Sequence, residues 1–190
     1  MSQTLDIRPG MSPEEIYEHM EPIEGLRVEL LGGRLVMTGG ASIRHDDVIW
    51  QLVRALFGIA DDRGWRLLEN RTIHIQATRD RPKPDLVVAP SDAPRYDDNE
   101  LYAHGVLLAA EVASPGSKYD GRKAKAEYYA QGEVPLYMLI DIEAGEPAVA
   151  LFSDPVSGTY RSVVTVLLGE QLPLPEPFGM ILDTASLQIG

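Results

Sequence analysis

The chain of 190 residues contains no cysteine. The absence of thiols excludes disulfide bonds, a cysteine nucleophile and thiolate metal sites, so a bound metal would be held by oxygen or imidazole ligands. Such ligands favour Mg²⁺, Mn²⁺ or Ca²⁺. With 44% hydrophobic and 24% charged residues, the composition is that of an ordinary globular protein. The length predicts a single domain over residues 1–190.

The sequence also lacks a long apolar segment and an excess of positive charge. No apolar stretch approaches the roughly 18 to 20 residues that span a bilayer, and the N-terminal sequence MSQTLDIRPG lacks the basic and apolar regions of a signal peptide. We therefore expect a cytoplasmic protein without membrane contacts. The 29 acidic and 17 basic residues give a net charge of −12. This charge repels polyanions at long range, which argues against a non-specific nucleic-acid coat protein but allows a local basic site.

Hydrophobic periodicity and turn signals predict alternating helices and strands. Ser12 and Glu15 have the spacing of a helix capping box, and Gly32-Gly33 between two short apolar runs is typical of a hairpin turn. The predicted helices cover 13–19, 45–60 and 120–131, and the predicted strands cover 27–31, 34–37, 65–69, 72–76, 86–88, 106–113, 137–142, 148–152 and 160–168. We expect an α/β fold with a mixed central β-sheet flanked by helices. The proline-rich segment 172–179 is expected to end regular strand pairing, because proline cannot donate to the ladder.

Carboxylates on two neighbouring predicted strands are the strongest chemical signal. Asp85 follows a proline-bearing turn at the start of one strand, and Glu111 is the charged residue in the apolar run 106–113. A continuously apolar strand is usually buried on both faces, where an ionised carboxylate is costly unless a cation, a metal or hydrogen bonds compensate it. Basic residues follow at Lys118, Arg122, Lys123 and Lys125. Two such carboxylates offer hard oxygen ligands for a divalent cation that keeps several waters.

This combination suits metal-assisted hydrolysis of a phosphodiester, in which a metal activates water and neutralises charge on phosphorus. A lysine beside the metal adds positive charge and can orient the attacking water. Arg122, Lys125 and Tyr129 share one face of the predicted helix, because they are spaced i, i+3 and i+7. A structural interpretation stays open, in which Glu111 forms a buried salt bridge with Lys125 or Arg122.

The order and spacing of several motifs resemble one known family. The motifs are RVELLGGRLVM, a histidine opening a long helix, KPDLVV, EVASPGS, a lysine four residues before a tyrosine, and VPLYMLIDI. Together they resemble the Uma-type (Uma-two) family of restriction endonucleases in the PD-(D/E)XK nuclease superfamily, over about residues 25 to 145. The resemblance implies a restriction-endonuclease-like core, with Asp85 and Glu111 as ligands of Mg²⁺ (or Mn²⁺). It further implies an endonuclease that acts on nucleic acid, with DNA as substrate, and a homodimer.

The sequence departs from the superfamily pattern at two positions. The usual lysine stands two residues after the second carboxylate, where this chain has Ala113. The resemblance therefore points to Lys125 on the following helix, one turn before Tyr129. Family members tend to carry an aspartate one turn before that lysine, where this chain has Gly121 with Asp120 beside it. Asp120 either serves after a small shift or only caps the helix.

Glu29 and His45 occupy further polar positions that the family often keeps. Glu29 is either another metal ligand or a solvated residue of the hairpin. His45 either orients a water near the metal or is a helix N-terminal residue satisfied by a backbone group. The remaining histidines have no ligand spacing with one another and are expected to be structural or exposed: His19, His74 and His104.

We therefore expect a metal-dependent endonuclease, and two alternatives from other classes stay open. One is a catalytically inactive nucleic-acid-binding or regulatory module on the same fold, which the displaced lysine and the negative charge favour. The other is a metal-dependent hydrolase of a small phosphorylated molecule, which would need no basic groove.

Overall fold

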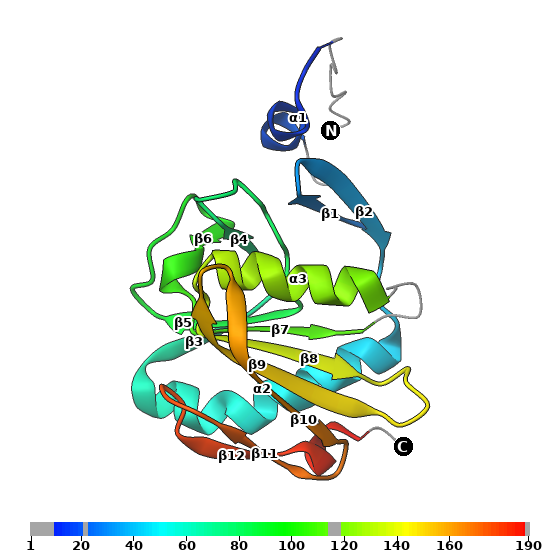
Figure 1. Cartoon of the computed structure of the whole chain (residues 1–190), viewed down its shortest axis with the longest axis vertical. Coiled ribbons are helices and arrows are strands. Elements are labelled where there is room, and N and C mark those ends of the chain that lie inside the picture. Colours follow the sequence, from blue (N-terminus) through cyan, green and yellow to red (C-terminus); the bar gives the residue numbers. More distant parts are fainter. Residues whose placement is uncertain (1–9, 21–22, 114–118, 189–190) are drawn as a thin grey trace.

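The chain forms an α/β fold around a six-stranded mixed β-sheet, in a computed structural model that describes residues 10–20, 23–113 and 119–188, with the backbone alone for 119–124 (Figure 1). The strands of this sheet are β3 (Trp65–Glu69), β5 (Leu86–Pro90), β7 (Leu108–Val112), β8 (Leu136–Asp141), β9 (Ala148–Val156) and β10 (Thr159–Leu167). Their order is β10-β9-β8-β7-β5-β3. The neighbours β7 and β8 are parallel and the other pairs are antiparallel. The predicted fold class is therefore confirmed.

Two helices cover the two faces of this sheet. The helix α2 (Ile43–Arg63) packs apolar residues at helical spacing against alternate residues of the strands, and Figure 1 shows it behind the sheet. The helix α3 (Tyr119–Gln131) lies on the opposite face and links the parallel strands β7 and β8. Because every residue of β7 is buried, the prediction of a strand covered on both faces is confirmed. This burial isolates any charge on β7 from bulk water.

The N-terminal elements reach the site from outside the main sheet. The helix α1 (Pro13–His19) begins with the predicted capping box, and the strands β1 (Leu26–Leu31) and β2 (Arg34–Gly39) form the predicted hairpin as a separate two-stranded sheet. Gly32 and Gly33 both adopt positive φ in its turn, which glycine tolerates best. The backbone amide of Arg81 donates to the carbonyl of Leu30 at 2.7 Å. This contact fixes β1 beside the segment that leads into β5.

Two expectations about strands need correction. The strand β4 (Thr72–His74) is shorter than predicted and pairs in parallel with an unpredicted strand, β6 (Glu100–Tyr102), outside the main sheet. The proline-rich segment does not end strand pairing, because β11 (Gln171–Leu174) pairs with β12 (Met180–Asp183). Pro173 fits there because each strand of a two-stranded sheet has one unpaired edge.

Short 3-10 helices complete the described fold at Ala103–Gly105 (η1) and Thr184–Leu187 (η2). Within the described part of the chain, no helix has both the length and the apolar character that crossing a membrane requires.

Candidate active site

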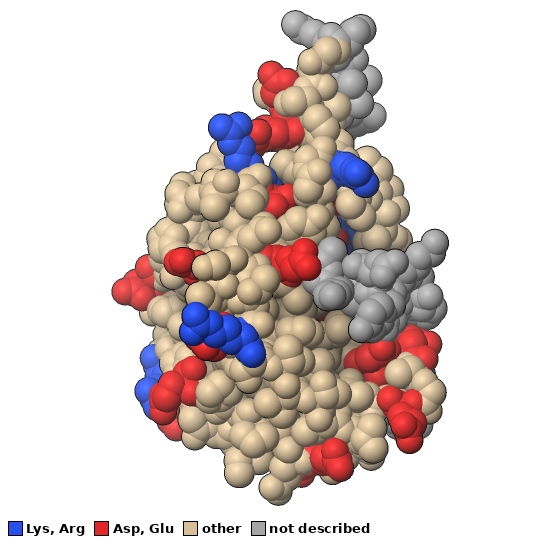
Figure 2. Space-filling view, in the orientation of Figure 1, with Lys and Arg blue, Asp and Glu red and all other residues tan. Residues whose placement is uncertain are grey.

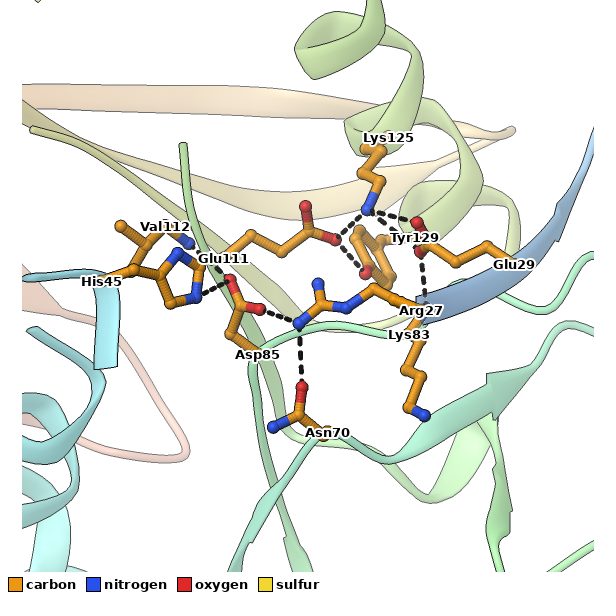
Figure 3. A network of polar contacts seen from close by, with 10 residues as sticks. All are labelled: Arg27, Glu29, His45, Asn70, Lys83, Asp85, Glu111, Val112, Lys125 and Tyr129. Atoms are coloured by element: carbon orange, nitrogen blue, oxygen red, sulfur yellow. Dashed lines mark hydrogen bonds and ion pairs between the residues drawn. The ribbon is translucent and has the colours of Figure 1, made fainter. Parts of the chain in front are cut away.

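The two predicted carboxylates lie at adjoining positions of neighbouring strands. Asp85 immediately precedes β5 and Glu111 lies in β7, where Leu86 pairs with Ala110. The backbone amide of Asp85 donates to the carbonyl of Ala110 at 3.0 Å, which closes the strand pair at this point. Asp85 is 3% exposed and Glu111 is 7% exposed. Figure 3 shows both side chains in one polar network together with residues from β1, α2 and α3.

Asp85 is held by three donors of different origin. Its Oδ2 accepts a hydrogen bond from the backbone amide of Val112 at 2.8 Å and lies 3.2 Å from His45 Nε2, while Oδ1 forms an ion pair with the Arg27 guanidinium. Burial alone would raise the pKa of Asp85, but the His45 hydrogen bond and the Arg27 charge outweigh it and hold the pKa below its usual value. Asp85 is therefore an ionised carboxylate at neutral pH.

Glu111 is held from the α3 side of the sheet. Its Oε1 accepts hydrogen bonds from the Tyr129 hydroxyl at 2.6 Å and from Lys125 Nζ at 3.0 Å. Lys125 and Tyr129 lie one helical turn apart, so their side chains reach the same carboxylate. Burial raises the pKa of Glu111, Lys125 opposes that rise, and the nearby negative charges of Glu29 and Asp85 add to it. Glu111 thus holds a proton more readily than Asp85 does.

Lys125 links Glu111 to a third buried carboxylate, that of Glu29 on β1. Its Nζ lies 3.0 and 3.1 Å from the two carboxylate oxygens of Glu29. Burial would lower the pKa of Lys125, but Glu111 and Glu29 outweigh this and raise it, so the ammonium group stays charged. Glu29 also accepts a hydrogen bond from the backbone amide of Lys83 at 2.8 Å and is only 2% exposed. It is therefore not a solvated hairpin residue.

Arg27 and Asn70 belong to the same network and were not predicted. Arg27 Nη2 donates to Asn70 Oδ1 at 2.8 Å in addition to pairing with Asp85. Arg27 and Glu29 are two residues apart on β1, so both side chains point to the same side of the strand. Because alternate residues of a strand share a side, the position of Arg27 two residues before Glu29 could have indicated it as a site residue. Asn70 lies between β3 and β4, and no sequence motif indicated it.

The structure brings together six of the predicted site residues: Glu29, His45, Asp85, Glu111, Lys125 and Tyr129. The predicted Asp120 side chain, and those of the neighbouring bases Lys118, Arg122 and Lys123, lie outside the described residues. The buried salt bridge between Glu111 and Lys125, which the structural interpretation required, is present.

The carboxylates of the site include oxygen ligands for a divalent cation. Among the described residues, no group of three or more histidine, aspartate or glutamate side chains is arranged as a metal site. Mg²⁺, however, commonly binds through one or two carboxylates and keeps several waters. The hard oxygen atoms of Asp85 and Glu111, on adjoining strand positions, fit that requirement. The cations Arg27 and Lys125 already lie against these two carboxylates, as expected where negative charge is concentrated.

Comparison with solved structures identifies a protein with a similar fold. The fold is similar to that in the crystal structure of "a putative nuclease belonging to DUF820" from Anabaena variabilis ATCC 29413, with a TM-score of 0.74. The two sequences are 15% identical, and the similarity covers 93% of this chain and 97% of that chain. The two proteins therefore share the same α/β fold.

The sequence then identifies the family. The chain belongs to the Uma2 family, whose model is described as "Putative restriction endonuclease" and matches residues 14–185. The resemblance inferred from the motifs is thus confirmed and extends beyond them at both ends. No curated protein matches the chain.

Proposed function

We propose that the protein is a metal-dependent endonuclease that hydrolyses phosphodiester bonds of DNA and acts as a homodimer. Asp85, Glu111 and Lys125 are the proposed catalytic residues. The observation that carries this proposal is the contact of 3.0 Å between Lys125 Nζ and Glu111 Oε1, at a strand position adjoining Asp85. This contact places a lysine beside Glu111, although the usual lysine position holds Ala113. Membership of the Uma2 family supports the same activity.

Asp85 and Glu111 would hold the cation, which is Mg²⁺ or Mn²⁺ in this proposal. When bound, such a cation neutralises charge on the phosphoryl group and lowers the pKa of a bound water. Asp85 is suited to this role because its low pKa keeps it ionised. Glu111 is suited to it because Tyr129, at 2.6 Å, fixes the position of its carboxylate.

Lys125 would stabilise the negative charge that develops on the phosphoryl oxygens. Its raised pKa keeps the ammonium group protonated, so it acts by electrostatic stabilisation rather than as a general base. Glu29 holds Lys125 in place through both of its carboxylate oxygens. His45 orients Asp85 through the contact of its Nε2 with Oδ2. Arg27 is suited to pairing with a substrate phosphate, because a guanidinium group donates two parallel hydrogen bonds to phosphate.

A groove beside β3 is the proposed path of the nucleic-acid backbone. Arg66, Arg71 and Arg95 line it, and none of them forms an ion pair with an acidic side chain in the part of the chain that the structure describes. Arg71 directly follows Asn70, which touches Arg27 in the site. The groove also contains acidic residues, namely Asp97, Asp98 and Glu100. The arginines therefore provide separate phosphate contacts rather than a uniformly basic surface.

An inactive nucleic-acid-binding or regulatory module is the second candidate function. Arg27 and Lys125 already neutralise the two carboxylates, so the cluster is electrostatically satisfied by protein groups. The face drawn in Figure 2 carries separate basic patches among acidic ones and no continuous basic surface. The neutralised cluster favours a site that binds without cleaving, and the scattered basic residues favour a regulatory role over a broad nucleic-acid contact.

Plasmid cleavage distinguishes the two candidates. Supercoiled plasmid is incubated with the protein and Mg²⁺ or Mn²⁺, beside Asp85→Asn and Lys125→Ala. Asp154→Asn is the matched control, because Asp154 is exposed on β9 and lines neither the site nor the groove. We expect nicking by the wild type and the control, and none by the other two variants. Equal nicking by all four proteins would reject the site, and metal binding without any nicking would favour the inactive module.

A further inference from the structure

The solvent-facing side of α2 carries a line of large apolar side chains that no described residue covers. Ile43, Trp50 and Phe57 are 81%, 58% and 61% exposed. They are spaced seven residues apart, which is about two helical turns, so they lie along one line of the helix. Single exposed hydrophobic residues are common, but three large ones along one line of a helix, two of them aromatic, are typical of a protein–protein contact.

Two exposed charged residues lie in the same line. Asp47, Trp50, Arg54 and Phe57 are spaced three, four and three residues apart, which is the spacing of the seam between two packed helices. Arg54 makes a hydrogen bond of 3.4 Å to Gln51, and within the described ranges neither Asp47 nor Arg54 takes part in an ion pair. Their opposite charges lie at nearly equal distances on either side of Trp50. The line is therefore complementary to a copy of itself turned by a two-fold rotation.

A glycine beside this line supports the same interpretation. Gly58 is exposed inside α2, and a Cβ added there would meet nothing within 4 Å. Glycine inside a helix is less favourable than alanine, and no contact within the described residues requires it here. A residue without a side chain next to Phe57 would allow a second helix to approach closely.

We propose that a second copy of this chain occupies the line, with the two α2 helices antiparallel and the two-fold axis near Trp50. Trp50 then meets Trp50 of the other copy, and each Asp47 faces an Arg54 across the interface. Ile43 of each copy lies against Phe57 and Gly58 of the other. This interface assigns a surface to the homodimer of the proposed function and does not depend on catalytic activity.

The size of the contact sets its expected strength. Aromatic side chains bury about 150–250 Å² each, so Trp50 and Phe57, which are 58% and 61% exposed, would together bury roughly 250 Å² per copy. That is about a third of the roughly 800 Å² per partner that stable interfaces bury, so the surrounding helix surface must supply the rest. The dimer is therefore expected to form at micromolar concentration and to dissociate on dilution.

Sedimentation velocity of the full chain between about 1 and 100 μM tests the interface. We expect a concentration-dependent dimer. Asp47→Arg alone, or Arg54→Asp alone, is expected to raise its dissociation constant at least about tenfold. In the double variant Asp47→Arg/Arg54→Asp, the two charges are exchanged and can pair again. Its dimer dissociation constant is therefore expected to lie within a few-fold of the wild-type value. Far-UV circular dichroism checks that each variant is folded.

Val163→Lys is the matched control, because Val163 is 53% exposed on β10, an edge strand of the main sheet and not part of the α2 line. It is expected to leave the dimer unchanged. A wild type that stays monomeric over the whole range would overturn the proposal. A dimer that dissociates in Val163→Lys but not in Asp47→Arg would also overturn it. So would a double variant that dimerises no more tightly than the single variants.

Discussion

Replacing Lys125 by methionine would remove a positive charge from between two buried carboxylates. Lys125 Nζ lies 3.0 Å from Glu111 Oε1 and 3.0 Å from Glu29 Oε1, and these glutamate side chains are only 10% and 3% exposed. Methionine retains most of the length of the side chain, so the change is mainly electrostatic. Breaking a buried ion pair by removing one partner costs about 3–5 kcal/mol. We expect a loss of this size in the free energy of unfolding at neutral pH.

The loss is expected to depend on pH. Burial raises the pKa of Glu111 and Lys125 opposes that rise, so the Lys125→Met variant has a still higher Glu111 pKa. A carboxyl group with a raised pKa in the folded state binds protons that the unfolded state releases, so folding gains stability as pH falls toward the unfolded pKa. The cost of Lys125→Met should therefore be at least about 1 kcal/mol smaller near pH 5 than near pH 7.5.

Urea unfolding followed by circular dichroism at both pH values measures this effect. The double variant Lys125→Met/Glu111→Gln should recover part of the loss, because it also removes one of the unpaired charges. Lys83→Met is the control, since the pKa of Lys83 is lowered by burial and by the nearby charges of Arg27 and Arg71, so its positive charge is not stabilising. The reasoning is refuted if the free energy of unfolding of Lys125→Met lies within about 0.5 kcal/mol of the wild-type value at neutral pH. It is also refuted if the difference between the two proteins does not change with pH.

Three further predictions concern stability and substrate binding. Arg81→Met should lower the free energy of unfolding by about 3–5 kcal/mol, because Arg81 is fully buried and pairs with Glu100 at 2.9 Å; a loss below about 1 kcal/mol in urea unfolding would contradict this. Burial and the Arg81 charge lower the pKa of His74 to about 4, so the wild type should lose stability as pH falls from about 6.5 toward about 4. Because His74 is partly exposed, solvent screening limits this loss to about 1 kcal/mol; His74→Phe should abolish it, and equal pH profiles for the two proteins would refute the assignment. Arg71→Ala should weaken DNA binding about threefold to tenfold at low salt and reduce its salt dependence, while the single-turnover cleavage rate at saturation stays unchanged; unaltered affinity in fluorescence anisotropy would argue against the groove.

Local signals in the sequence were sufficient to predict most helices and strands. Two of these signals are the capping box of Ser12 and Glu15 and Gly64, which ends α2 in the left-handed backbone conformation. Both act within a few residues, so their effects can be predicted without the fold. The carboxylate of Glu111 inside an apolar strand indicated the site, because its burial requires a compensating partner. The i, i+4 spacing of Lys125 and Tyr129 then provided two candidates for that partner.

The remaining features depend on contacts between distant segments. The pairing of Arg27 with Asp85 joins residues 58 positions apart in the sequence, and it exists because the hairpin lies against the main sheet. Asn70 lies in a turn whose position only the fold determines. Pro173 was interpreted as ending strand pairing, because its unpaired position in a two-stranded sheet could not be foreseen. Trp50 and Phe57 lie within a predicted helix, but their shared exposed line is visible only in the structure.

The most direct test of the proposed active site uses Glu111→Gln. Glutamine keeps an oxygen that can accept the Tyr129 hydrogen bond and removes a charge that lies near Asp85 and Glu29. Lys125 keeps its contacts with both carboxylate oxygens of Glu29 in this variant, so we expect the protein to stay folded. Circular dichroism checks the fold, so that a loss of activity is not attributed to unfolding. Glu127→Gln, at an exposed position of the same helix as Lys125, is its control.

The measurement is the single-turnover rate of Mg²⁺-dependent cleavage of an end-labelled DNA duplex. The proposed mechanism predicts that Glu111→Gln cleaves at least about 100-fold more slowly than the wild type, that Glu127→Gln is unaffected, and that EDTA stops the reaction. Cleavage by folded Glu111→Gln at the wild-type rate, or wild-type cleavage that persists in EDTA, would contradict it.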